Sequence, residues 1–263
     1  MSRLVVVSNR VPNPRATQPQ AGGLSVALAD ALSRDGGLWF GWDGQLSQTP
    51  VSRPRIQHHE GIDYATLPLC KADYDDFYLG YANAVIWPVF HFNLGAMDYE
   101  RRFSEAYARV NALFADALMP LLEADDIVWV HDYHLIPLAR ELRDRGLRTR
   151  IGFFLHIPFP DYDVLRAMPG HRQLLEDLCR FDLLGFQTDN DRHAFEESAT
   201  RAIGALVRAP GALRHRHRNL RTGVYPVGVD VDGLATLAKR SLAAPRVHRL
   251  IDGLGERDLM IGV

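Results

Sequence analysis

Short apolar runs alternate along the chain with segments that have helical spacing. Leu4–Val7 and Ile127–Val130 are continuous apolar runs, which indicate strands buried on both faces. Apolar residues then recur at intervals of three and four, as in amphipathic helices. The pattern predicts a Rossmann-like parallel sheet with helices on both faces, an α/β fold. Further strands are expected within 150–160, 181–188 and 222–230, with helices at 73–83, 103–123, 171–180 and 189–206.

Two segments depart from this alternation. Residues 36–69 are rich in glycine and alternate in polarity, which predicts an inserted β-ribbon or short antiparallel strands. The last segment, "ERDLMIGV", has the pattern of the opening strand of a further unit. The basic run "RHRHRNLR" at 214–221 contains no aromatic residues for stacking on bases, so a solvated loop is expected there.

Polar residues follow three of the predicted strands directly. They are Ser8-Asn9-Arg10, the motif "HDYH" at 131–134, and His156. Ligands of open α/β sheets bind beyond the carboxyl ends of the strands. The three strand ends are therefore the candidate site.

Arg10 and a glycine pair point to phosphate chemistry. A guanidinium offers a fixed fork of donors to a phosphate, although a salt bridge to a carboxylate explains Arg10 equally well. Gly22 and Gly23 would let a ligand approach the backbone at the start of a helix, but such pairs are usually turns. No G-x-G-x-x-G follows the first strand, which argues against a nicotinamide-dependent dehydrogenase.

The other polar positions each have a functional and a structural reading. His131 and His134 could bind a metal, but packed histidines fit better because no third ligand is evident. Asp132 fits an acceptor for sugar hydroxyls. His156 could donate to a sugar oxygen or serve the fold alone. Among the aromatic residues of 76–92, most are expected in the core, whereas Trp87 could form the wall of a sugar site and Tyr78 could bind a phosphate.

Composition narrows the class of protein. The 263 residues are 47% hydrophobic and 24% charged, with a formal net charge of -2. These values are typical of a soluble globular protein and argue against a general nucleic-acid binder. Two distant cysteines, Cys70 and Cys179, build neither a disulfide framework nor a zinc site, so a cytoplasmic location is expected. No apolar stretch is long enough for a membrane span, so no membrane partner is expected.

The ordered motifs as a group resemble the trehalose-6-phosphate synthase family. They include "RLVVVSNR", "AGGL", "GGLWFGW", "NAVIWPVFH", "VWVHDYHL", "RIGFFLHIPFP", "DLLGFQTDNDR" and "VYPVGVD", and the resemblance runs from residue 2 to the last residue. It implies the amino-terminal domain of a GT-B glycosyltransferase. Such enzymes transfer glucose from UDP-glucose to glucose 6-phosphate with retention, giving α,α-trehalose 6-phosphate and UDP.

The resemblance also implies a role for individual acceptor-side residues. Arg10 and Tyr78 match positions that hold the phosphate of glucose 6-phosphate, and Trp42 lies in the motif beside them. Trp87 and Asp132 match residues that shape the acceptor-sugar site and hydrogen-bond the sugar.

On the donor side, Gly22 and Gly23 match the loop that meets the diphosphate of UDP-glucose, and His156 matches a contact to the transferred glucose. The proline-rich stretch 12–19 would be a mobile arm. Asp132 and His156 are the expected catalytic residues. No metal and no cofactor are expected.

The family continues beyond a strand like "LMIGV" into a motif with an arginine and a lysine for the UDP diphosphate, followed by a second Rossmann-like lobe. The expected organisation is therefore an acceptor-binding domain at 1–235 and an interdomain segment with the first strand of the next domain at 236–263. Such a lobe is expected to be inactive alone, and its apolar tail predicts homo-oligomers. A glucosylglycerol-phosphate synthase-like transferase and a non-catalytic sugar-phosphate-binding fragment are the alternatives.

Overall fold

The structure is a computed structural model that describes residues 2–14, 28, 32, 36–228, 231–255, 257 and 259. The chain divides into two compact units, Met1–Pro226 and Val227–Val263. The boundary expected at residue 235 falls within helix α9 (Val231–Ser241) of the second unit. The division at 1–235 and 236–263 stays a prediction.

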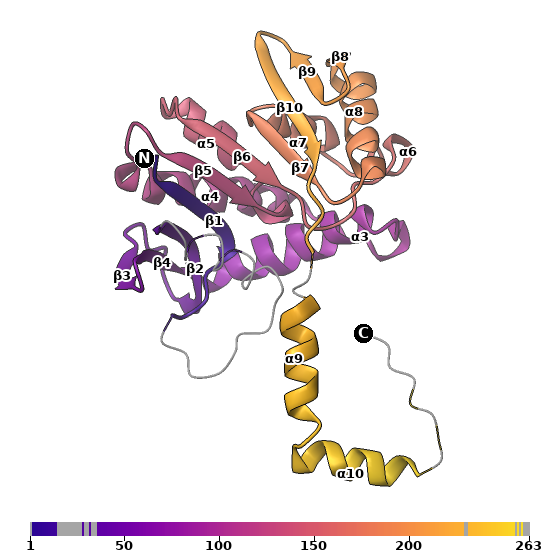
Figure 1. The fold of residues 1–263 in the computed structure, drawn as a ribbon. Coiled ribbons are helices and arrows are strands. Elements are labelled where there is room, and N and C mark those ends of the chain that lie inside the picture. The colour runs from indigo at the N-terminus through magenta and orange to yellow at the C-terminus, as the bar shows by residue number, and fades with distance from the viewer. Residues whose placement is uncertain are drawn as a thin grey trace. The chain divides into compact units, whose positions relative to one another are not determined.

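One ten-stranded sheet forms the centre of the first unit (Figure 1). Its strand order is β3-β4-β2-β1-β5-β6-β7-β10-β9-β8. The strands from β4 to β10 in this order are parallel, while β3 on one edge and the β9–β8 pair on the other run antiparallel. The bounds are β1 Leu4–Arg10, β2 Gly37–Ser47, β3 Arg55–His59, β4 Ile62–Cys70, β5 Ile127–His131, β6 Arg150–Phe154, β7 Leu183–Phe186, β8 Leu206–Ala209, β9 Ala212–His215 and β10 Arg218–Val224.

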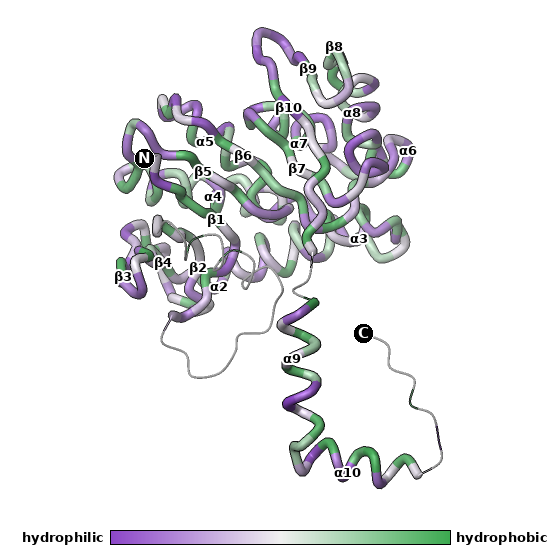
Figure 2. The backbone as a smooth tube through the Cα atoms, viewed as in Figure 1, coloured by the Kyte–Doolittle hydropathy of each residue, from purple (hydrophilic) through white to green (hydrophobic). Residues whose placement is uncertain are grey.

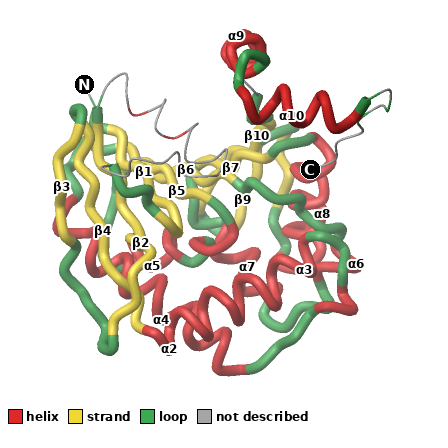
Figure 3. Tube along the Cα trace, turned by 90° about the horizontal axis from the view of Figure 1, so that it is seen from below, coloured by secondary structure: helices red, strands yellow, loops and turns green. Residues whose placement is uncertain are grey.

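Helices cover one face of this sheet, with α4, α5 and α7 lying against the strands (Figure 3). The helices whose bounds the structure describes in this unit are α2 Lys71–Asp73, the π-helix η1 Tyr74–Ile86, α3 Trp87–Phe90, α4 Arg101–Leu118, α5 Leu138–Asp144, α6 Tyr162–Leu165, α7 His171–Leu178 and α8 Asp189–Ile203. Single 3₁₀ turns occur at η2 Leu94–Ala96, η3 Met119–Leu121 and η4 Tyr133–Leu135. The expected α/β fold is confirmed.

The core lies on both faces of the sheet because successive residues of β1 are all apolar. Val5 and Val7 belong to the large cluster under the helices, whereas Val6 belongs to a second cluster. Leu28 and Leu32 pack in that second cluster with Trp39 of β2. A strand that is apolar on both sides is the mark of a covered parallel sheet.

Close helix packing on the covered face depends on one glycine. Gly80 of η1 lies against Phe103 of α4, and a Cβ atom at Gly80 would come within 2.6 Å of the Phe103 ring. The missing side chain therefore brings η1 and α4 together beneath the sheet.

The interpretation of residues 36–69 as an inserted ribbon was wrong in part. β2 pairs in parallel with both β1 and β4, so it extends the main sheet, and only β3 with β4 forms an antiparallel pair. The physical reason is visible in the neighbours Trp39 and Phe40, which point to opposite faces and are both buried. Glycine content had obscured a strand with two apolar faces.

The basic run at 214–221 is also not a loop. It forms the turn and flanking strands of the β9–β10 hairpin, whose tip is hydrophilic (Figure 2). Leu213 and Leu220 face each other in the hairpin register and are buried, and they anchor it to the sheet. Alternating polar residues on the outer face had masked this pair.

The described residues of the second unit form two helices, α9 and α10 (Pro245–Leu254). Both helices are amphipathic and their apolar side chains are exposed: Val231, Leu234, Leu237, Leu250 and Ile251. Most of "ERDLMIGV", the expected strand, lies outside the described residues. Within the described part of the chain, no helix combines the length and apolar character needed to cross a membrane.

Candidate functional site

The three polar strand ends lie on adjacent strands. Ser8 of β1 is opposite His131 of β5, and His131 is opposite Phe154 of β6. The chain leaves β1 towards β2 on one side, while β5 lies on the other side, so β1 and β5 flank a topological switch point. Ligands of open α/β sheets bind at such points. Arg10, Asp132 and His156 thus follow three neighbouring strands at one end of the sheet.

Arg10 is held at the end of β1 by contacts with an aromatic ring and a glycine. Its guanidinium carbon lies 5.5 Å from the centre of the Trp42 ring, a cation–π contact. A Cβ atom on Gly44 would lie 2.7 Å from a guanidinium nitrogen of Arg10, so a larger residue there would displace the guanidinium. The side chain is exposed, and no carboxylate among the described residues pairs with it. The salt-bridge interpretation of Arg10 is therefore not supported within that part of the chain.

Aromatic rings connect Arg10 to the "HDYH" motif. The Trp42 ring lies 5.9 Å from the Tyr78 ring, and Tyr78 stacks on His134 at 5.6 Å with planes 15° apart. His134 in turn stacks on Tyr133 at 4.0 Å. The structure therefore brings Arg10, Trp42, Tyr78 and the 131–134 segment into one continuous set of contacts.

Asp132 occupies a strained backbone position. Its φ of 74° and ψ of 165° lie in a region that is populated almost only by glycine. The backbone N–H donates to the carbonyl of Phe154 at 2.9 Å, and the carboxylate accepts from the backbone N–H of His156 at 3.3 Å. Burial raises the pKa of Asp132 to about 6, so the carboxylate is costly to ionise. Strain of this kind persists where the surroundings hold it.

Three polar residues that the sequence did not single out hold this segment in place. The Tyr107 hydroxyl donates to the Tyr133 carbonyl, and the Asn111 amide donates to the His134 carbonyl at 3.1 Å. Asn83 accepts from the Tyr133 hydroxyl at 2.9 Å. Of these three residues, only Asn111 could have been noticed in the sequence, because it is a polar residue within the apolar stripe of α4. In the structure it is completely buried.

The two histidines of the motif have different surroundings. Burial lowers the pKa of His134 to about 3, so its ring is neutral within the aromatic stack. His131 instead makes a hydrogen bond to His156. No group of three or more His, Cys, Asp or Glu that could hold a metal occurs among the residues that the structure describes.

Among the described residues of the expected site, Trp87 is not joined to these contacts. Trp87 is 43% exposed and stacks on His91 at 4.0 Å, one helical turn after Asn83. Gly22 and Gly23 lie outside the described residues. Of the stretch 12–19, Pro12–Pro14 are described and line a cavity of about 170 Å³ with Asp43 and Gln45. The expected roles of Trp87, Gly22 and Gly23 stay predictions.

Asp132→Asn should stabilise the protein in a pH-dependent way. The folded pKa of about 6 lies above the ordinary value of 3.8, so the wild type loses stability as the pH rises through this range. A difference of about two pKa units corresponds to about 3 kcal/mol. We expect a gain of up to about this size, since the Asn side chain can still accept from the backbone N–H of His156. Urea unfolding from pH 4 to pH 8 measures the difference.

The gain in the free energy of unfolding of Asp132→Asn should be absent at pH 4 and complete by pH 8. The exposed Asp98→Asn is the matched control and should show no such trend. Equal stability of Asp132→Asn and wild type at every pH would contradict a carboxylate that burial destabilises.

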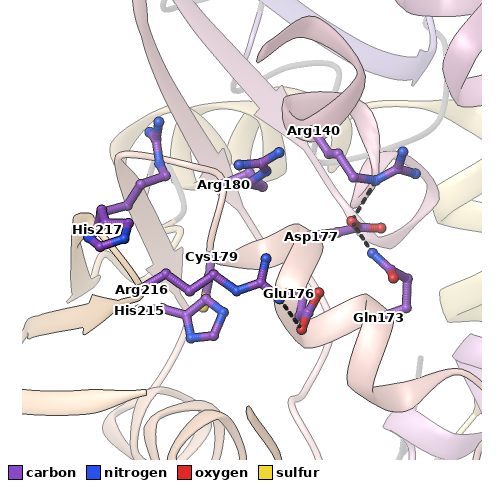
Figure 4. Close-up of a pocket in the computed structure, with 10 residues that line it drawn as sticks. Arg140, Gln173, Glu176, Asp177, Cys179, Arg180, His215, Arg216 and His217 are labelled. Carbon is purple, nitrogen blue, oxygen red and sulfur yellow. Dashed lines mark hydrogen bonds and ion pairs between the residues drawn. The ribbon is translucent and has the colours of Figure 1, made fainter. Parts of the chain in front are cut away.

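Apart from Arg10, several arginines gather around a cavity in the region of α5, α7 and the β9–β10 hairpin (Figure 4). Here a cavity of about 290 Å³ is lined by four arginines, three of them labelled in the figure. Each of these arginines has a carboxylate partner, whereas Arg10 has none among the described residues. The guanidiniums that line this cavity are therefore already paired. The pairs are Arg140–Asp177 at 2.8 Å, Arg180–Asp144 at 3.0 Å, Arg216–Glu176 at 2.9 Å and Arg218–Asp182 at 2.9 Å.

Comparison with known proteins gives a consistent result. The trehalose-6-phosphate synthase of Citrobacter koseri is 47% identical over 250 residues, which cover 95% of this chain and 52% of that protein. The crystal structure of an alpha,alpha-trehalose-phosphate synthase (UDP-forming) from Burkholderia vietnamiensis has a TM-score of 0.94 at 44% identity and covers 98% of this chain and 55% of its own. The chain thus spans about half the length of the relatives it matches.

A third comparison concerns a ligand. The structure of the Burkholderia xenovorans alpha,alpha-trehalose-phosphate synthase (UDP-forming) in complex with glucose-6-phosphate has a TM-score of 0.90 at 44% identity, covering 98% of this chain and 56% of that one. The sequence profile described as "Glycosyltransferase family 20" matches residues 2–263. With nearly every residue of the chain inside that match, the protein belongs to glycosyltransferase family 20.

Proposed function

We propose that this chain is the acceptor-binding lobe of a trehalose-6-phosphate synthase. The proposed reaction transfers glucose from UDP-glucose to glucose 6-phosphate, with retention, and gives α,α-trehalose 6-phosphate and UDP. The observation that carries the proposal is Arg10, an exposed guanidinium that is held by Trp42 and paired with no carboxylate among the described residues. Such a fork of donors fits the oxygens of a phosphate monoester.

The rest of the acceptor site follows from the same geometry. Tyr78 stands beside Trp42 with a hydroxyl that can donate to the phosphate, and Asp132 supplies a carboxylate for the sugar hydroxyls at the adjacent strand end. Holding the sugar at both ends orients its anomeric hydroxyl towards the donor. We assign Asp132 and His156 to the reacting side of the acceptor, and Gly22, Gly23 and His156 to UDP-glucose.

The names of the relatives support the choice of substrates. The Burkholderia proteins are described as UDP-forming, and one of them is described in complex with glucose-6-phosphate. Transfer with retention in this proposal uses no protein nucleophile. The chain's own residues bind and orient the acceptor, and they exclude water from it. A cytoplasmic location and self-association through the exposed apolar faces of α9 and α10 remain part of the proposal.

Calorimetric titration of this chain tests the acceptor. Glucose 6-phosphate should bind more tightly than glucose, glycerol 3-phosphate or inorganic phosphate, each by at least about tenfold, because only the full acceptor engages both Arg10 and Asp132. Equal affinity for glycerol 3-phosphate would favour the glucosylglycerol-phosphate alternative. Equal affinity for inorganic phosphate would reduce the site to anion binding, and absence of binding would remove the assignment.

A further inference from the structure

Two histidines meet at the ends of β5 and β6. Nδ1 of His131 lies 3.0 Å from Nε2 of His156, a hydrogen-bond distance. The His131 ring is 1% exposed and packs against Trp129 at 4.2 Å, while the His156 ring packs against Phe154 at 4.6 Å. The two imidazoles are thus fixed relative to each other by their aromatic neighbours.

Both imidazoles are neutral in this position. Burial lowers the pKa of His156 to about 4 and lowers the pKa of His131 well below its ordinary value. A neutral imidazole carries a proton on one nitrogen only. A hydrogen bond between the two rings therefore has two forms: either Nδ1–H of His131 donates, or Nε2–H of His156 donates.

The far side of His131 distinguishes the two forms. Its Nε2 atom is buried and has no hydrogen-bond partner among the described residues. If His156 donated, His131 would carry its proton on Nε2, as a buried N–H without an acceptor. If His131 donates, Nε2 is left as a bare lone pair. In folded proteins, a buried N–H group without an acceptor is rarer than a buried acceptor atom without a donor. The second form is therefore favoured.

We propose that His131 is a positioning residue that fixes His156 as a neutral imidazole with its proton on Nδ1. The Nδ1 atom of His156 has no hydrogen-bond partner among the described residues, and it is not among the buried atoms that lack one. It therefore presents an N–H donor to a ligand oxygen. The identification of that oxygen with a sugar rests on the proposed function, whereas the position of the proton does not. In this state, His156 does not accept a proton at Nδ1.

The position of the proton can be measured directly on this chain. Two-bond ¹⁵N–¹H correlation spectra of ¹⁵N-histidine-labelled protein distinguish Nδ1–H from Nε2–H rings, and the His156→Gln variant assigns the signals of His156. His91 is an internal standard, because its Nδ1 lies 2.7 Å from the Trp87 carbonyl and must carry the proton to donate there. We expect the His156 pattern to match that of His91 at pH 8, and we expect His156 to remain neutral down to pH 5.5. An Nε2–H pattern for His156 would overturn the proposal.

Two substitutions of His131 separate positioning from packing. His131→Asn keeps an N–H donor close to the place of Nδ1 and should keep His156 in the Nδ1–H form. His131→Phe keeps a ring but no donor and should move the proton of His156 to Nε2. The same tautomer in both variants would contradict the role of His131, provided that the His91 signals are unchanged.

Failure of the proposed function gives a different result. If glucose 6-phosphate does not bind but the proton is on Nδ1 of His156, the acceptor assignment is lost and this inference stands. If binding is observed with the proton on Nε2, this inference is lost and the proposed function stands.

Discussion

Arg10→Ala should weaken the binding of glucose 6-phosphate to this chain by roughly 100-fold. Hydrogen bonds to charged groups contribute about 1.5–3 kcal/mol each, and about 1.4 kcal/mol corresponds to a tenfold change in Kd. The guanidinium has no carboxylate partner in the described structure, so its removal leaves no buried charge behind to confuse the result. Calorimetric titration of both proteins with glucose 6-phosphate and with glucose measures the effect, and only the phosphorylated sugar should respond.

Arg216→Ala is the matched control for this experiment. Arg216 is also an exposed arginine, but it is paired with Glu176 at 2.9 Å in the cavity of Figure 4, so its loss should leave binding unchanged. Gly44→Ala tests the same site without removing the charge. The added Cβ would lie 2.7 Å from the Arg10 guanidinium and should displace it, with a smaller loss of affinity. Unchanged affinity in Arg10→Ala would remove Arg10 from the phosphate site.

Phe114→Ala should lower the free energy of unfolding by about 3–5 kcal/mol. Phe114 of α4 is completely buried and meets Phe40 of β2 edge to face at 5.4 Å and 89°. Truncation leaves a cavity at the contact between the helix layer and the strand that carries Trp42. Most domains are stable by only about 5–15 kcal/mol, so this is a large fraction of the total. Urea unfolding followed by circular dichroism measures the change.

Phe92→Ala controls for the loss of an aromatic ring as such. Phe92 is 53% exposed, so its truncation removes little buried area and should change stability by less than about 0.5 kcal/mol. A loss below about 1 kcal/mol for Phe114→Ala would mean that the core closes around the missing ring, contrary to the packing described.

The parallel centre of the sheet could be predicted from the sequence, because its strands are apolar on both faces. Ile127–Val130 and the run from Ile151 to Phe154 are continuous apolar segments, and both are strands in the structure. The antiparallel edges were harder to identify. Leu213 and Leu220 form a buried pair only once the β9–β10 hairpin has formed. The run of basic residues between them gives no indication of that pairing.

The residues of the site could be named from the sequence more easily than their relations to one another. Arg10 and Asp132 follow predicted strands, so their common end of the sheet was expected. The contact between His131 and His156 depends instead on the register of β5 with β6, which periodicity does not fix. The strained backbone of Asp132 could not be foreseen either, since an aspartate is not a residue that this conformation favours.

The outermost strands determine how far the sheet can grow. β8 at one edge is only four residues long, and its exposed residues include Leu206 and Val207. β3 at the other edge is five residues long, mostly exposed, and carries Arg55 and two histidines. Short border strands are a poor template for a strand from another molecule. The shortness of both edges should therefore limit fibre-like extension of the sheet of the first unit.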